Sequence, residues 1–380
     1  MIEAEQFVHA AQARGFDLYA GVPCSYLKPF INYVIDADDL QYVGAANEGD
    51  AVAIAAGAEL GGRRSVVMLQ NSGLGNTVNP LTSLTYTFRI PVLVIVTLRG
   101  EPGGAPDEPQ HELMGQITTG MLEQMGVPWS WFPDEADAIE SVLDQVDAHM
   151  NAEHRPYALV MRKGSVAPHA LKARPKAREL AAQGVARPSA SASRTEMLRA
   201  AQSVIGAGDI VVATTGYTGR ELYALDDRAN QIYMVGSMGC AVSFGLGIAL
   251  AQPGRKVIVL DGDGAALMRL GAQSIVGYEQ PANLVHVLLD NAIHESTGGQ
   301  ATVARSVNFC AIAAASGYNN VVSLAQPQSV AEAVSDVRSG PTFIHVPVLP
   351  GVPESLPRPT VTPAEVAARL RTKLQERNNS

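Results

Sequence analysis

The sequence predicts an α/β protein of two domains with the same topology, each a mostly parallel β-sheet with helices on both faces. Near-continuous apolar runs alternate with helical stretches, as expected for parallel strands that are buried on both faces. The stretch 51–73 also resembles the stretch 241–264, because a small-residue helix, a basic turn, an apolar strand and a polar glycine loop follow in the same order. The offset of 190 residues (241 − 51) is half of the 380-residue chain.

The apolar runs give the expected elements in chain order. Strands are expected at Ser65–Leu69, Pro91–Leu98, Tyr157–Arg162, Asp209–Thr214, Lys256–Leu260, Asn283–Leu289 and Thr342–Val348. Helices are expected between them, for example over Asp134–Met150 and Ala265–Tyr278, and a polar helix begins at about Pro363. This alternation of strand and helix is typical of crossover connections in a parallel sheet.

The segment from Pro168 to Ser193 separates the two halves. It is rich in Ala, Pro, Ser, Lys and Arg and lacks hydrophobic periodicity, which indicates a linker. The expected organisation is therefore a first domain over 1–167, a linker over 168–193 and a second domain over 194–380.

Net charge, hydropathy and cysteine content exclude several classes of protein. The formal net charge of −9 argues against nonspecific nucleic-acid binding. No apolar run reaches membrane-spanning length, and the first residues lack the basic region of a signal peptide, so neither a membrane nor a secretory role is expected. The cysteines Cys24, Cys240 and Cys310 are far apart, without metal-binding spacing, and indicate reduced thiols in a cytoplasmic protein.

Two strand ends carry the most informative polar residues. One apolar run ends on Gly262-Asp263-Gly264, and the next expected strand ends on Asp290-Asn291. The carboxyl ends of parallel strands meet at one edge, where such sheets bind ligands. A carboxylate and an amide oxygen suit Mg²⁺, and the glycines allow a diphosphate to approach the backbone. A buried strand end with a capping aspartate is the alternative, whereas no dinucleotide or P-loop glycine pattern is present.

This Gly-Asp-Gly…Asn pattern resembles the signature of thiamin-diphosphate enzymes, which pair a pyrimidine-binding domain with a diphosphate-binding domain. The chain resembles that pair joined directly, without a middle domain. The resemblance implies that Mg²⁺ is bound by Asp263, Asn291 and the carbonyl of Ile293. Residues Gly262, Gly264 and Ala265 would approach the diphosphate.

Two further segments resemble the same family. Glu48, in the segment Gly44–Ala51, matches the glutamate that donates a hydrogen bond to the pyrimidine ring; the alternative is an acidic first turn of a helix. Gly236-Ser237-Met238 matches the segment that bends the cofactor. The resemblance implies that Met238 wedges between the rings and that Gly236 offers its carbonyl, although a methionine before a glycine-rich helix is more often core.

Longer stretches resemble the phosphonopyruvate decarboxylase family, and sulfopyruvate decarboxylases are similar in pattern. The stretches are Gly21–Val34, Thr214–Tyr223, Tyr233–Cys240 and Leu289–Gln300. The resemblance implies decarboxylation of a small anionic 2-oxo acid, 3-phosphonopyruvate, to phosphonoacetaldehyde and CO₂ in phosphonate and antibiotic biosynthesis. It also implies a homo-oligomer with active sites between subunits. Sulfopyruvate decarboxylation, another 2-oxo-acid decarboxylation, carboligation and a non-enzymatic subunit remain alternatives, although the last would be expected to lose Glu48, Asp263 or Asn291.

The remaining candidates would contact the substrate. Ser25 and His111 are the candidates near the reacting carbon, and Lys28 and Arg220 are the candidates for the phosphonate, although loop histidines and long basic side chains are more often solvated. Polar contacts are expected from Asn71, Ser72, Thr297 and Gly298. The loop 100–107 is expected to be either a lid or a surface turn.

Overall fold

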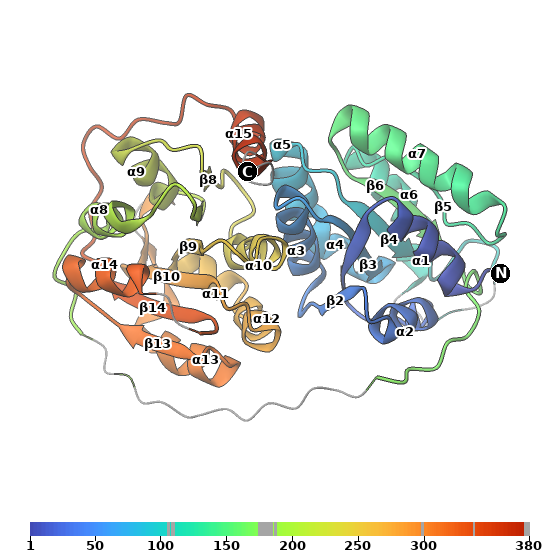
Figure 1. Cartoon of the computed structure of the whole chain (residues 1–380), viewed down its shortest axis with the longest axis horizontal. Helices are drawn as coiled ribbons and strands as arrows, with labels where there is room; N and C mark the ends of the chain where they lie inside the picture. The colour runs from blue at the N-terminus through green and yellow to red at the C-terminus, as the bar shows by residue number, and fades with distance from the viewer. Residues whose placement is uncertain are drawn as a thin grey trace. The chain divides into compact units, whose positions relative to one another are not determined.

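The computed structural model describes residues 1–104, 107, 111–173, 185, 188–297, 300–336 and 339–375. The chain forms two compact units, Met1–Ala177 and Arg178–Ser380, and each has its own sheet (Figure 1). The division falls inside the segment 168–193 that was expected to be the linker. In the described part of the chain, no helix has both the length and the apolar character that a membrane crossing requires.

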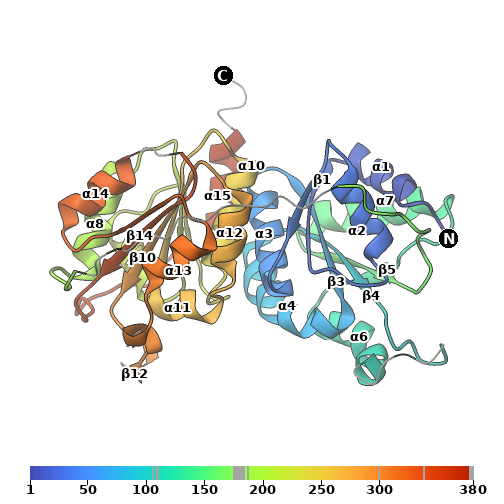
Figure 2. The same cartoon turned by 90° about the horizontal axis from the view of Figure 1, so that it is seen from below.

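The first unit is a parallel sheet of six strands in the order β2-β1-β3-β4-β6-β5. The strands are β1 (Phe16–Gly21), β2 (Gln41–Gly44), β3 (Arg64–Gln70), β4 (Leu93–Thr97), β5 (Trp129–Trp131) and β6 (Tyr157–Met161). The helices are α1 (Ala4–Ala13), α2 (Lys28–Asp36), α3 (Glu48–Leu60), α4 (Leu74–Pro80), α5 (Tyr86–Phe88), α6 (Glu112–Gln124) and α7 (Ala138–Glu153). Figure 2 shows α1, α2 and α7 on one face of this sheet and α3 and α4 on the other.

The second unit is also a parallel six-stranded sheet, in the order β13-β14-β10-β9-β7-β8. Its strands are β7 (Ile210–Ala213), β8 (Gln231–Tyr233), β9 (Val257–Gly262), β10 (Leu284–Asp290), β13 (Asn320–Ser323) and β14 (Thr342–Pro347). Its helices are α8 (Arg194–Val204), α9 (Tyr217–Leu225), α10 (Ala241–Ala251), α11 (Asp263–Met268), α12 (Ala272–Glu279), α13 (Phe309–Ser316), α14 (Pro327–Ser335) and α15 (Pro363–Gln375). A short hairpin, β11 (Ile293–His294) and β12 (Gln300–Ala301), follows β10.

The two sheets share one topology. When the six strands of each unit are numbered in chain order, the first sheet reads 2-1-3-4-6-5. The second sheet, read from its β8 edge, gives the same order. The prediction of two parallel domains with the same topology is therefore confirmed, and the repeat at 51–73 and 241–264 corresponds to α3–β3 and α10–β9.

All seven expected strands are present, with ends that shift by one or two residues. The strands that the apolar runs did not predict include the four sheet edges, β2, β5, β8 and β13. An edge strand pairs on one side only, and three of these four carry half-exposed side chains, so a short mixed sequence suffices there. Strand β1 was also not predicted.

The single helix expected over Ala265–Tyr278 was wrong. The chain forms α11 and α12 instead, separated around Arg269, whose φ of −134° and ψ of 54° are not helical. The break gives α11 its own direction from the end of β9, so the residues that follow Asp263 are oriented independently of α12.

Close helix packing depends on small side chains in the second unit. A Cβ atom at Gly245 of α10 would lie 2.3 Å from Cγ2 of Val259, so α10 rests directly on β9. A Cβ atom at Gly277 of α12 would lie 1.7 Å from the carbonyl oxygen of Ser316 at the end of α13. These contacts fix the helices that cover β9 and β10.

Gly277→Ala should lower the free energy of unfolding of the second unit by about 1–3 kcal/mol, because the added methyl group would overlap a backbone carbonyl. Urea unfolding followed by circular dichroism measures the effect. Gly254→Ala is the matched control, because a Cβ atom there has no neighbour within 4 Å. Equal stability of the two variants would contradict the packing.

Candidate functional site

The carboxyl ends of β9 and β10 lie side by side, because the two strands are hydrogen-bonded in parallel with Leu289 opposite Gly262. A small cleft of about 70 Å³ opens at this edge. The residues that line the cleft include Thr214, Thr215, Gly216, Met238, Gly262, Asp263, Gly264, Ala265, Asn291, Ile293 and His294. Seven of the residues predicted for cofactor binding therefore meet in one place.

Asp263 is a buried carboxylate at the first position of α11, with 3% of its surface exposed. Burial raises the pKa of Asp263, and the charge of Asp290 raises it further. The Thr302 hydroxyl donates to Oδ2 of Asp263 over 2.5 Å and opposes this shift. A buried carboxylate beside a second acidic group is stabilised by a bound cation.

The turn after β10 brings Asn291 and Ile293 to the cleft. Asn291 accepts a hydrogen bond from the Ile293 amide through Oδ1 over 3.1 Å. Ala292 adopts the left-handed conformation with a φ of 58°, which reverses the chain between them. The amide oxygen of Asn291 keeps a second lone pair, and Ile293 lines the same cleft.

The donor set fits Mg²⁺. The described residues contain no group of three or more His, Cys, Asp or Glu side chains that suits a metal. The cleft offers instead one carboxylate, one amide oxygen and one carbonyl, which are hard ligands that leave coordination positions for phosphate or water.

Gly264 allows side chains of the cleft to approach the backbone closely. A Cβ atom at Gly264 would lie 2.5 Å from Cε1 of His294 and 3.4 Å from the Met238 methyl group. Any larger residue would therefore clash with His294. The oxygen donors of the cleft suit Mg²⁺, and the glycine loop at the start of α11 would let a diphosphate approach the backbone.

The segment Gly236–Gly239 forms a tight turn before α10. Ser237 and Gly239 have φ values of 52° and 89°, and the Cys240 amide donates to the Ser237 carbonyl. The turn places Met238 in the lining of the cleft, whereas Gly236 and Ser237 do not line it.

The sequence analysis missed three charged or polar residues around the cleft. Arg194 opens α8, is 7% exposed and bonds both Glu221 and Glu295 over 2.6 Å. Glu295 also accepts a hydrogen bond from the Gly351 amide, so this cluster holds the segment that follows β11. Arg194 lies just after the linker in no recognisable motif, so only its partners in the folded chain mark it.

In the first unit, Glu48 opens α3 at the carboxyl end of β2, after the N-cap Asn47. Asn76 donates to Oε2 of Glu48 over 2.7 Å. A Cβ atom at Gly73 would lie 2.1 Å from Oε1, so the carboxylate rests against a glycine that must stay without a side chain. Neither Gly73 nor Asn76 was predicted, although both follow β3 as Ser72 does.

The other candidates of the first unit also follow its strand ends. Ser25 and Lys28 are exposed after β1, and the Lys28 ammonium makes no hydrogen bond or ion pair with any residue that the structure describes. Ser72 is exposed and accepts from Gln70. Asn71 is fully buried, and its Nδ2 donates to the Arg99 carbonyl and to Thr118, which favours a bracing role.

Four candidates lie apart from both sets or outside the described residues. His111 is 1% exposed at the start of α6, where a Cβ atom at Gly100 would touch its carbonyl. The Arg220 guanidinium donates to the Leu356 carbonyl and does not line the cleft. Thr297 ends a 3₁₀ turn, and Gly298 lies outside the described residues.

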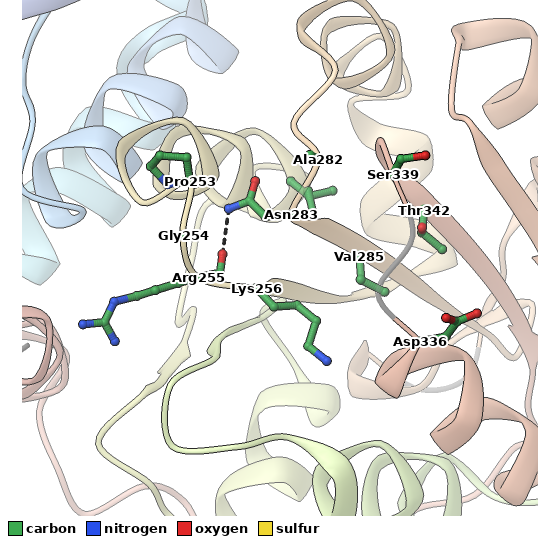
Figure 3. A pocket seen from close by; sticks show the side chains of 11 residues that line it. Pro253, Gly254, Arg255, Lys256, Ala282, Asn283, Val285, Asp336, Ser339 and Thr342 are labelled. Carbon is green, nitrogen blue, oxygen red and sulfur yellow. Dashed lines mark hydrogen bonds between the residues drawn. The ribbon is translucent and has the colours of Figure 1, made fainter.

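A larger hollow of about 450 Å³ lies at the opposite edge of the second sheet, by the amino ends of β9 and β10 (Figure 3). Two of its long polar side chains are already engaged in hydrogen bonds. Asn283 donates to the Arg255 carbonyl over 2.7 Å, and the Lys256 ammonium donates to the Val334 carbonyl over 2.9 Å. We therefore assign the chemistry to the smaller cleft at the carboxyl edge, where ligands of parallel sheets bind.

Comparison with known proteins identifies both units. Residues 1–119 match the N-terminal TPP binding domain of thiamine pyrophosphate enzymes, and residues 214–346 match the C-terminal TPP binding domain. A phosphonopyruvate decarboxylase from Streptomyces viridochromogenes is 44% identical over 98% of this chain and 94% of its own length. A sulfopyruvate decarboxylase from Methanosarcina acetivorans is 30% identical over 97% of both chains.

A solved structure has the same fold. The thiamine diphosphate-dependent 4-hydroxybenzoylformate decarboxylase of Rhodococcus jostii superposes with a TM-score of 0.72. The match covers 92% of this chain and 99% of that chain at 15% identity, so it bears on the fold alone.

Asp263→Asn should raise the free energy of unfolding of the cofactor-free protein at pH 7, because a neutral amide replaces a buried carboxylate. Folding raises the Asp263 pKa, so wild-type stability falls as the pH rises above the ordinary aspartate value of about 4. The advantage of the variant should disappear below that pH, where both side chains are neutral.

Urea unfolding between pH 4 and 8 measures this difference. Asp39→Asn is the control, because a hydrogen bond from Gln12 lowers the pKa of Asp39 and gives the opposite sign. A stability gain at Asp263 that is independent of pH would contradict the role of the buried charge.

Proposed function

The chain belongs to the thiamine pyrophosphate enzymes, and from that premise we propose that it decarboxylates 3-phosphonopyruvate to phosphonoacetaldehyde and CO₂ with thiamin diphosphate and Mg²⁺. The observation that carries the substrate is the 44% identity to a phosphonopyruvate decarboxylase over nearly the full length of both chains. The oxygen-lined cleft supports the cofactor and the metal independently of that identity.

In this proposal, the second unit holds the diphosphate end of the cofactor. Asp263, Asn291 and the Ile293 carbonyl would bind Mg²⁺, and Gly264 would admit the phosphate oxygens. Met238 would give the apolar support for the bent cofactor, with Gly236 and Ser237 forming the turn behind it. When bound, thiamin diphosphate supplies the electron sink that allows a 2-oxo acid to lose its carboxylate.

The first unit would supply proton transfer through Glu48. The Asn76 amide and Gly73 fix the carboxylate in one orientation, with Oε2 occupied by Asn76. Oε1 would then hold the hydrogen bond to the pyrimidine ring. A carboxyl group held in this way can act as a general acid or base without reorganisation at each turnover.

The phosphonate would be held beside the exposed residues that follow β1 and β3. Lys28 is the cation of choice, because its ammonium is exposed and makes no ion pair within the described residues. Arg99 is nearby in the fold but already pairs with Asp107. Ser25 and Ser72 would add hydroxyl donors, with His111, Arg220, Thr297 and Gly298 as weaker candidates.

Sulfopyruvate decarboxylation is the alternative, supported by the 30% identity to a sulfopyruvate decarboxylase. A sulfonate has the same tetrahedral shape as a phosphonate but one negative charge fewer.

We also propose that the enzyme acts as a homo-oligomer, which is the arrangement that the family resemblance implies. It would act in the cytoplasm, in phosphonate biosynthesis.

The substrate assignment predicts that kcat/KM for phosphonopyruvate exceeds that for pyruvate at least ~100-fold, because a site built for a dianion leaves its donors unpaired with pyruvate. Sulfopyruvate should be a weaker substrate than phosphonopyruvate.

Lys28→Ala should raise KM for phosphonopyruvate about 10-fold and leave the pyruvate reaction unchanged. Aldehyde release measures all three reactions.

Lys172→Ala is the matched control for the loss of an exposed cation. Equal turnover of phosphonopyruvate and pyruvate by the wild type would reject the substrate. Preferred turnover of sulfopyruvate would select the alternative, and equal penalties on all acids would reject only the role of Lys28.

Glu48→Gln should lower kcat by about 10²–10⁴-fold while the Kd for thiamin diphosphate stays near the wild-type value. Asn76→Ala should also lower kcat, but it should add nothing in the Glu48→Gln background, because its effect passes through that carboxylate. Asn79→Ala, one turn along α4, is the control. Additive losses would show that Asn76 does not act through Glu48.

A further inference from the structure

Three polar side chains line up on one face of the second sheet, beneath the Asn291 turn. Ser323 of β13 is opposite His345 of β14, and Asp290 of β10 is opposite Pro347 of β14. His345 stands two residues before Pro347, so it shares a face with Asp290. The three strands are consecutive neighbours in the sheet, so the side chains form one row.

The row is connected by hydrogen bonds. Nε2 of His345 lies 3.0 Å from Oδ2 of Asp290, and Nδ1 of His345 lies 2.8 Å from the Ser323 hydroxyl. Because the carboxylate can only accept, the imidazole donates from Nε2 to Asp290, and in the neutral ring Nδ1 then accepts from the Ser323 hydroxyl. His345 and Asp290 are 2% and 3% exposed, so these bonds are sheltered from water.

The other oxygen of Asp290 shapes the turn. Oδ1 accepts a hydrogen bond from the Ala292 amide over 3.1 Å. Ala292 is the left-handed residue between Asn291 and Ile293, a conformation that costs free energy in a residue other than glycine. Both oxygens of Asp290 are therefore engaged, one by the Ala292 amide and the other by His345. Asp290 thus stabilises the turn, while Asn291 and Ile293 are the residues of the turn that would bind the metal.

The neighbouring strand has a similar pair of residues, although its histidine and aspartate approach each other without a hydrogen bond. Asp261 of β9 is opposite Leu288, and His286 stands two residues before Leu288 on β10. His286 Nε2 lies 3.4 Å from Oδ2 of Asp261, while Oδ1 of Asp261 accepts from the Gly262 amide. Both β9 and β10 therefore carry an aspartate within their last two residues that lies close to a histidine of the adjacent strand.

We propose that His345 is a positioning residue for the metal site: through Asp290 it fixes the left-handed turn that presents Asn291 and the Ile293 carbonyl to Mg²⁺. The proposal rests on the proposed function, because it requires that Mg²⁺ and thiamin diphosphate bind at this cleft. Partners behind metal ligands typically set metal affinity by about 10–100-fold.

The competing explanation is that the row only satisfies buried polar groups. In that case a substitution of His345 would lower stability but leave a folded variant with normal Mg²⁺ affinity. The two explanations differ in metal affinity, which can be measured without turnover.

The test titrates Mg²⁺ by isothermal calorimetry into wild-type protein and variants saturated with thiamin diphosphate. His345→Leu should raise the Kd for Mg²⁺ at least about 10-fold, and kcat at saturating Mg²⁺ should stay within a few-fold of wild type. His345→Gln should restore the affinity, because its amide offers a donor near the place of Nε2. Ile344→Ala, a buried neighbour on the opposite face of β14, is the control for lost stability alone.

Equal Mg²⁺ affinity in His345→Leu and the wild type would overturn the positioning role and leave the proposed function intact. A wild type that binds neither Mg²⁺ nor thiamin diphosphate would overturn the proposed function and this inference with it. If His345→Leu does not fold, Ser323→Ala and Asp290→Asn test the same row. Their Mg²⁺ affinity must fall for the inference to stand.

Discussion

The parallel pairing of β9 with β10 is the constraint on which the site depends. Asp263 and Asn291 are 28 residues apart (291 − 263), and only the shared carboxyl edge of two neighbouring strands brings them together. That edge buries Asp263 almost completely, which makes its ionised form costly in the empty protein. The fold thus holds a charge that is unfavourable alone and that a divalent cation would relieve.

Much of this could be predicted from sequence because the informative residues sit where apolar runs stop. Central strands such as β4 and β10 are buried on both faces, and their composition alone marks them. The key polar residues follow such strands or open the next helix, as Asp263, Asn291 and Glu48 do. Both the sequence pattern and the family resemblance therefore predicted them.

The other features of the site and the fold could not be predicted, because they depend on contacts between residues that are far apart in the sequence. Asn76 reaches Glu48 across 28 residues, and His345 reaches Asp290 across 55 residues, with no shared motif to connect either pair. The break at Arg269 divides a segment that was predicted as one helix, and Gly271, a poor helix former, lies beside it. The burial of Asn71, predicted to face the substrate, follows from the packing of α6 against its neighbours, since Thr118 of α6 accepts its hydrogen bond.

The identical strand order of the two units bears on how the chain arose. Two sheets that share the order 2-1-3-4-6-5, joined by one linking segment, are what gene duplication followed by fusion produces. Under that history, the ancestral polypeptide had one such sheet. The two halves now differ at their strand ends, although their strands keep the same order: one half has Glu48 at the start of α3, and the other has Asp263 and Asn291 after β9 and β10. Specialisation was thereby confined to a few loops, and the scaffold could remain unchanged as the chemistry was divided between two halves of one gene.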